Sequence, residues 1–189
     1  MIHEELAASG ETVAGGEVWR LLTSGFLHFG AGHLLFNMLS LYILGRVLET
    51  EIGRLRFAFI YFESLLAGSF GGLLLEPMDL SAGASGAIFG LFPAGVMVMH
   101  NQGISPTENG LLLWLGLSLA FTFLDSSISI GGHLGGLAGG ALAALLFEVA
   151  DRLPSRGPRV ERLLEVTVLM LVVVVGALAV VGSIVISDN

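Results

Sequence analysis

The feature that most constrains this chain is a series of long apolar runs. Six runs rich in Leu, Val, Ile, Ala and Gly cover residues 29–48, 57–75, 84–99, 110–124, 131–150 and 163–186. A helix needs about 20 mostly apolar residues to cross about 30 Å of hydrocarbon, and lipid leaves no partner for an unpaired backbone N–H or C=O. We therefore predict an all-α polytopic membrane protein with six transmembrane spans.

Composition supports this assignment and argues against other classes of protein. Hydrophobic residues make up 54% of the chain and charged residues only 13%, whereas a soluble domain carries about 25% charged residues. The formal net charge of −8 argues against a nucleic-acid partner, since a phosphate backbone selects a basic face. Cysteine is absent, so disulfides and thiolate metal sites are excluded. We expect no metal and no cofactor.

The arginine distribution predicts the orientation in the membrane. All eight basic residues are Arg, and seven of them fall on one side if all six runs cross. These seven flank the first loop or lie between the last two runs: Arg46, Arg54, Arg56, Arg152, Arg156, Arg159 and Arg162. By the positive-inside rule this side is cytoplasmic. Both termini then face outside, as in a multi-pass protein of a prokaryotic cell membrane.

Four polar residues lie at one depth in the outer halves of these runs. His33 and Asn37 are four apart in the first run and therefore share a helix face. Ser85 begins the third run and His133 begins the fifth. Polar groups inside a membrane are costly unless they are paired. A base for a serine hydroxyl and donors for an oxyanion are the parts of an acyl-transfer site.

Glycine spacing indicates how the serine and the histidine could meet. Gly86 and Gly90 are four apart in the third run, and Gly136 and Gly140 are four apart in the fifth. Small residues at this spacing let two helices approach closely in lipid. Close packing of these two spans would bring the hydroxyl and the imidazole at their outer ends within hydrogen-bond reach.

Each of these residues also has a plainer explanation when it is taken alone. A serine at a helix start is usually an N-cap, an intramembrane histidine or asparagine often only ties helices together, and glycine pairs pack helices whatever the function. The agreement of four polar residues in depth and side favours a site. Glu63, inside the second run, fits neither pattern; it is either a protonated packing residue or a helix-contact or regulatory group.

At these positions the chain resembles the rhomboid family of intramembrane serine proteases. Three motifs in the family's order carry the resemblance: Trp19-Arg20 with His28 and HLLFN at 33–37, GASGAIFG at 83–90, and HLGGLAGG at 133–140. Their order and rough separations agree from residue 19 to about residue 150, and the three together are far more specific than the serine motif alone.

The resemblance implies a Ser–His dyad with no acid. Ser85 would be the nucleophile and His133 the general base, while His33, Asn37 and the Ser85 backbone N–H would form the oxyanion hole. Phe89 would pack against the base. The supporting residues would be Gly83, Gly86, Gly136 and Gly140 in the two motif helices, and Trp19, Arg20 and His28 in an outer loop.

The resemblance also divides the chain. Residues 1–28 would form an extracytoplasmic segment and outer loop, 29–150 a catalytic core of five transmembrane helices, 151–162 a cytoplasmic Arg-rich loop and 163–189 an additional helix. The family's core usually has a helix ahead of the Trp-Arg loop, but residues 1–18 are too polar to span. We therefore expect a rhomboid-like helical bundle that lacks the usual first helix and has an extra C-terminal transmembrane helix.

The implied function is an intramembrane serine endopeptidase that cuts single-pass transmembrane substrates near the outer membrane face. Its expected partners are those substrates and the lipid bilayer; the sequence does not predict an oligomeric state. The main alternative is an inactive or truncated rhomboid-like protein that binds membrane clients. No inverted repeat indicates a transporter, no His-Glu-x-x-His motif indicates a zinc protease, and a soluble-hydrolase elbow would need glycine where Ala87 stands.

Overall fold

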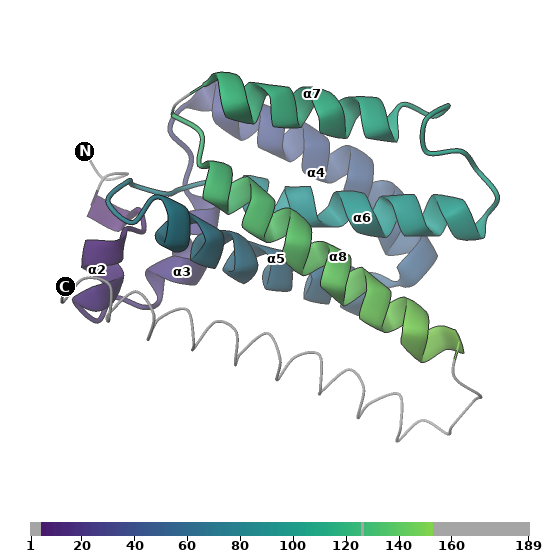
Figure 1. The fold of residues 1–189 in the computed structure, drawn as a ribbon, viewed down its shortest axis with the longest axis horizontal. Helices are drawn as coiled ribbons and strands as arrows, with labels where there is room; N and C mark the ends of the chain where they lie inside the picture. The colour runs from purple at the N-terminus through teal and green to yellow at the C-terminus, as the bar shows by residue number, and fades with distance from the viewer. Residues whose placement is uncertain (1–4, 126, 153–189) are drawn as a thin grey trace.

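The computed structural model describes residues 5–125 and 127–152, and this part of the chain is helical with no strand beyond one isolated bridge. The elements are α2 (Gly10–Ala14), α3 (Arg20–Thr23), the 3-10 helix η1 (Ser24–Phe26), α4 (Ala31–Ile52), α5 (Arg54–Leu75), α6 (Ser85–Asn101), α7 (Leu111–Leu124) and α8 (Ile130–Arg152), as Figure 1 shows. The all-α prediction is confirmed. The predicted span at 163–186 lies outside the described residues.

Three of these helices are long and apolar enough to cross a membrane, namely α4, α5 and α8. Helix α6 has 17 residues and α7 has 14, which at 1.5 Å per residue correspond to about 25 Å and about 21 Å. The number of six spans, and the absence of a first helix, therefore stay predictions.

The first two long helices are joined by a single residue, Gly53. Its φ of +82° lies in the left-handed region, which a residue with a Cβ adopts only at a cost. This glycine therefore reverses the chain without a loop, so that α4 and α5 run antiparallel.

Polar contacts gather at one end of the bundle. Arg56, at the start of α5, forms a bidentate ion pair with Asp151 near the end of α8, at 2.6 and 2.7 Å. Gln102, just after α6, donates to Glu51 near the end of α4 at 2.6 Å. The first residues of α6 and α8 must then lie at the opposite end, and these include Ser85 and His133.

Glycines bring α5, α6 and α8 into close contact at the centre of the bundle (Figure 1). A Cβ on Gly136 would meet the backbone of Gly86, and one on Gly140 would meet the backbone of Gly90. The two helices that carry Ser85 and His133 are therefore packed backbone to backbone, as small residues permit in membranes.

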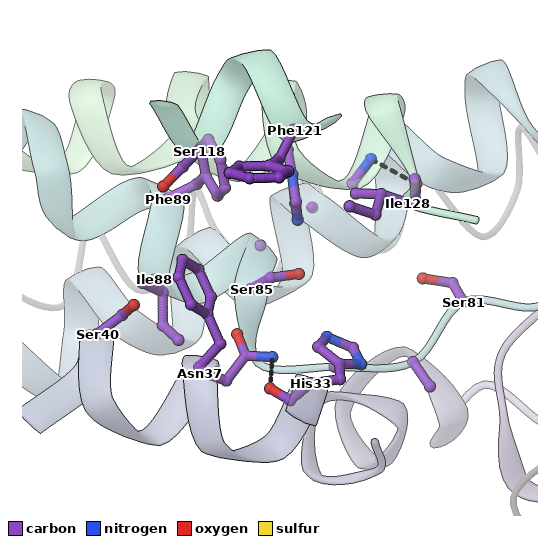
Figure 2. Close-up of a pocket in the computed structure, with 18 of the residues that line it drawn as sticks. His33, Asn37, Ser40, Ser81, Ser85, Ile88, Phe89, Ser118, Phe121 and Ile128 are labelled. Carbon is purple, nitrogen blue, oxygen red and sulfur yellow. Dashed lines mark hydrogen bonds between the residues drawn. The ribbon is translucent and has the colours of Figure 1, made fainter. Parts of the chain in front are cut away.

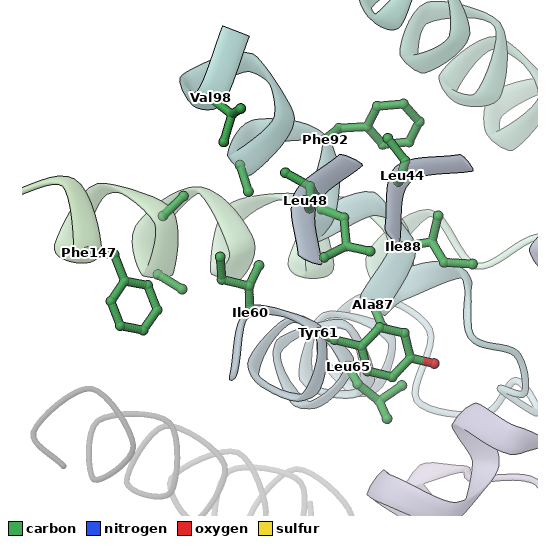
Figure 3. Close-up of a cluster of buried hydrophobic side chains, with 14 of the residues drawn as sticks. Leu44, Leu48, Ile60, Tyr61, Leu65, Ala87, Ile88, Phe92, Val98 and Phe147 are labelled. Atoms are coloured by element: carbon green, nitrogen blue, oxygen red, sulfur yellow. The ribbon is translucent and has the colours of Figure 1, made fainter. Parts of the chain in front are cut away.

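The interior is apolar, and so is much of the outside. One buried cluster joins residues of α4, α5, α6 and α8, including Leu48, Ile60, Phe92 and Phe147 (Figure 3). Large apolar side chains are also exposed along α4, α5 and α7, among them Leu35 (70%), Leu55 (70%) and Leu124 (83%). An apolar surface of this extent is typical of a lipid contact rather than of a water-facing protein.

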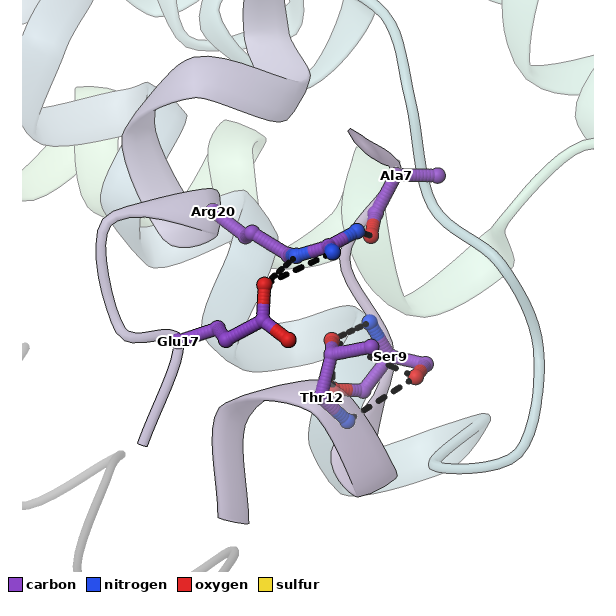
Figure 4. Close-up of polar contacts among 5 residues, drawn as sticks. All are labelled: Ala7, Ser9, Thr12, Glu17 and Arg20. Carbon is purple, nitrogen blue, oxygen red and sulfur yellow. Dashed lines mark hydrogen bonds and ion pairs between the residues drawn. The ribbon is translucent and has the colours of Figure 1, made fainter. Parts of the chain in front are cut away.

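The described part of the N-terminal segment folds over the end of the bundle opposite the Arg56–Asp151 pair. Ala8 and Ser81 exchange backbone hydrogen bonds of 3.0 and 2.7 Å, which tie this segment to the α5–α6 loop. The buried Arg20 donates to the Ala7 carbonyl at 2.8 Å and pairs with Glu17 at 2.7 Å. Figure 4 shows the contacts of Arg20 beside the capping box that begins α2.

Candidate active site

A cavity of about 570 Å³ opens between α4, α6, α7 and the start of α8, at the end of the bundle opposite the Arg56–Asp151 pair. Its lining includes His133. It also includes Ser85, His33 and Asn37, which Figure 2 shows. The structure thus brings all four polar residues, from three helices, around one space.

Ser85 is the first residue of α6 and is half-buried at the cavity. The N-cap position belongs to Ala84, so the plainer explanation of Ser85 as the capping residue does not hold. Gly83, with φ of +133°, precedes the turn; a Cβ there would lie 2.8 Å from Cε1 of His33 and 3.7 Å from Oγ of Ser85. This position therefore needs glycine both for its backbone and for the space beside His33.

The backbone of this segment adds donors to the same place. The first N–H groups of a helix have no carbonyl partner within the helix, and they carry the positive end of the helix dipole. Ser85 is in that first turn of α6. Its own N–H is thus of the kind that stabilises a negative oxygen beside the hydroxyl.

His133 lies in the first turn of α8 and is 7% exposed. The ring of Phe89 stacks on its imidazole with centroids 4.0 Å apart and planes at 19°. On its edge, Nδ1 lies 2.7 Å from the hydroxyl oxygen of Thr122 in α7. Two neighbours from different helices therefore hold the plane and the rotation of this ring, and Thr122 is one that the sequence analysis missed.

His33 and Asn37 form the α4 wall of the cavity (Figure 2). Asn37 is 2% exposed and donates through Nδ2 to the His33 carbonyl at 3.1 Å. An amide nitrogen has two protons, so one remains for another acceptor. The His33 ring is half-buried and meets the His28 ring edge to face, with centroids 5.0 Å apart.

Trp19, Arg20 and His28, which we expected in one loop, differ in burial. His28 is buried, and burial lowers its pKa, which favours the neutral ring. Its Nε2 has no hydrogen-bond partner within the described part of the chain. Trp19 is 57% exposed, and none of Trp19, Arg20 and His28 lines the cavity.

Glu76, the C-cap residue that follows α5, holds the start of α8. Its carboxylate accepts hydrogen bonds from the Ser129 hydroxyl at 2.5 Å, from the Ile130 N–H at 2.9 Å and from the Gly131 N–H at 3.4 Å. A carboxylate at a helix N-terminus satisfies orphan donors and complements the helix dipole. Glu76 therefore fixes the helix turn that carries His133, a role that no sequence pattern indicated.

Replacing Glu76 with Gln should lower the free energy of unfolding by about 1 kcal/mol, because the cap loses its charge. The loss should appear as a lower midpoint of thermal unfolding in detergent micelles. Glu108→Gln, the same change at an exposed position of the α6–α7 loop, is the matched control and should leave the midpoint unchanged. Equal midpoints for both variants would show that the cap contributes no stability.

Glu63 lies apart from the cavity. It is 9% exposed in α5 and faces α8, where a Cβ on Gly139 would be 3.0 Å from Oε1. Its Oε2 has no hydrogen-bond partner among the residues that the structure describes. Within the same residues, no cluster of three His, Cys, Asp or Glu could hold a metal ion.

Comparison with known proteins identifies the family. The rhomboid domain model matches residues 15–149, which span the N-terminal loop, the cavity and α8. The chain belongs to the rhomboid family. The rhomboid protein YdcA of Bacillus subtilis is 39% identical over 138 residues, which cover 71% of this chain and 69% of YdcA.

Two further relatives are longer than this rhomboid chain. Rhomboid protease GluP of Bacillus subtilis is 38% identical over 91% of the chain, but the match covers 33% of GluP. RHOMBOID-like protein 1 of Arabidopsis thaliana is 38% identical over 69% of the chain and 35% of its own length. The family and the apolar helices support a membrane protein of the hydrolase and protease class.

Proposed function

We propose that this rhomboid chain is an intramembrane serine endopeptidase in which Ser85 is the nucleophile and His133 is the general base. The observation that carries the proposal is the shared cavity, lined by Ser85, His133, His33 and Asn37, in a chain of a protease family. A serine, a buried imidazole and oxyanion donors in one place are what acyl transfer requires.

The chemistry assigns a role to each group. Nε2 of His133 takes the proton of the Ser85 hydroxyl as Oγ attacks the scissile carbonyl. The negative oxygen that forms is held by the Ser85 N–H, the free amide proton of Asn37 and the ring N–H of His33. His133 then protonates the leaving amine, an acyl-serine remains, and water activated by His133 hydrolyses it. The dyad is thereby regenerated with every proton accounted for.

The position of the cavity suggests the substrate. It lies at the end of the bundle opposite the Arg56–Asp151 pair, and the positive-inside rule makes the Arg-rich end cytoplasmic. Cleavage therefore takes place near the outer face, where water can reach the acyl-serine. The substrates are single-pass transmembrane proteins. Apolar residues such as Phe36, Trp114 and Phe121 line the same space and suit a segment that arrives from lipid.

The test is cleavage of a generic single-pass membrane substrate in liposomes, with this chain and its Ser85→Ala variant side by side. Product from the native chain that disappears with Ser85→Ala is the expected result. Ser105→Ala, in an exposed part of the α6–α7 loop, should cleave like the native chain. No product from the folded native chain, with substrate retained on it, would contradict the proposal and favour a protein that binds membrane clients without cutting.

A further inference from the structure

The hydrogen bonds of Thr122 carry an inference about the base. Thr122 is 1% exposed in α7. Its hydroxyl donates to the Ser118 carbonyl at 2.8 Å and lies 2.7 Å from Nδ1 of His133. Both contacts are buried, and in such surroundings a polar group that lacks its partner is expensive.

These two contacts select one tautomer of the ring. A hydroxyl has a single proton, and a carbonyl can only accept. Only one arrangement turns both contacts into hydrogen bonds: Thr122 donates its proton to the Ser118 carbonyl and accepts from His133. In that arrangement Nδ1 carries the hydrogen and Nε2 holds a lone pair. The opposite tautomer would leave two lone pairs facing each other at 2.7 Å or deprive the Ser118 carbonyl of the Thr122 proton.

We propose that Thr122 is a positioning residue that holds His133 in the tautomer with a free Nε2 lone pair, the form that can accept the Ser85 proton. The inference deepens the proposed function and rests on it. Once Nε2 is protonated, Nδ1–H still donates to Thr122, so the ring keeps its orientation through the reaction. Phe89 fixes the plane of the same ring. Thr122 thus acts through His133 and touches no reacting atom.

Through this contact, helix α7 orients the base as well as lining the cavity. The dyad residues lie on α6 and α8, whereas Thr122 belongs to α7, which also lines the cavity with Ser118 and Phe121 (Figure 2). The wall that faces the substrate and the group that orients the base are therefore on one helix. The uncharged Thr122 hydroxyl contacts Nδ1 of the histidine, the position that a carboxylate occupies in a three-residue triad.

The kinetic test compares Thr122→Val, which keeps the shape but removes the hydroxyl, with Thr122→Ser, which keeps the hydroxyl. We expect Thr122→Val to lower kcat by about tenfold or more with KM unchanged, and Thr122→Ser to stay close to the native chain. Thr50→Val removes a hydroxyl that makes the same bond to the carbonyl four residues earlier, at an exposed site in α4, and should cleave normally. Equal losses in both Thr122 variants would assign the residue to packing and overturn the proposal.

A spectroscopic test separates this inference from the proposed function. In protein labelled with ¹⁵N-histidine, the His133 signals are those lost in His133→Gln, and their shifts report which nitrogen carries the proton. We expect a protonated Nδ1 in the native chain and a mixture of tautomers in Thr122→Val. A protonated Nε2 in the native chain would overturn the role of Thr122 even if cleavage is observed. Absence of cleavage with a protonated Nδ1 would refute the protease and leave the tautomer assignment standing.

Discussion

Replacing His133 with Ala should lower the cleavage rate by about 10²–10⁴-fold, because the Ser85 hydroxyl then has no base. The imidazole is buried and held in place by Phe89 and Thr122, and alanine puts no group there that can take the proton. The measurement is the initial rate of product formation in liposomes at saturating substrate. The native chain and a folded His133→Ala variant are compared at equal concentration.

The double variant tests whether the two residues act as one unit. Groups that share a single step are far from additive, because the second substitution removes nothing that the first has left. We therefore expect the combined Ser85→Ala and His133→Ala variant to be as slow as Ser85→Ala alone, and no slower. Losses that multiply would show that Ser85 and His133 act independently, and a fully active His133→Ala variant would remove it as the base.

Replacing Gly140 with Ala should destabilise the protein by about 1–3 kcal/mol. The new Cβ would overlap the carbonyl oxygen, Cα and carbonyl carbon of Gly90, and backbone atoms cannot move aside as a flexible side chain can. Helices α6 and α8 must separate, and they are the helices that carry Ser85 and His133. Both the midpoint of thermal unfolding in detergent and the cleavage rate should therefore fall.

The matched control for this substitution is Gly116→Ala. Gly116 is also in a helix, but a Cβ there would meet nothing within 4 Å. Alanine is favoured over glycine in helices by about 1 kcal/mol, so this variant should be as stable as the native chain or more so. A Gly140→Ala variant with the same midpoint as Gly116→Ala would show that α6 and α8 do not rely on their close backbone contact.

The extents of the helices could largely be read from the apolar runs. The run at 110–124 became α7 (Leu111–Leu124), and the run at 57–75 became α5 (Arg54–Leu75), which begins three residues earlier. The difference has a physical cause: charged residues such as Arg54 and Arg56 continue a helix beyond the apolar part, because the helical backbone satisfies its own hydrogen bonds in lipid and at its surface.

The polar residues that line the cavity also stand out in the sequence. Ser85, His133, His33 and Asn37 are polar in apolar runs, and the structure places all four on one cavity. Their catalytic roles stay predictions that the cleavage assays decide. Thr122 and Glu76 could not be selected in this way. A threonine within a helix and a glutamate at its end are ordinary there, and only contacts from other helices distinguish them.

What can be read from this sequence follows from the cost of polar groups in lipid. That cost makes each span visible as an apolar run and makes each polar residue within a run stand out. The partners of those residues follow from the packing of α5, α6, α7 and α8. The hydrogen bonds between Thr122 and His133 and between Glu76 and Ile130 join side chains and backbone of different helices. They depend on donor–acceptor distances that must be right to within a few tenths of an ångström, which the packing of whole helices sets and no local pattern encodes.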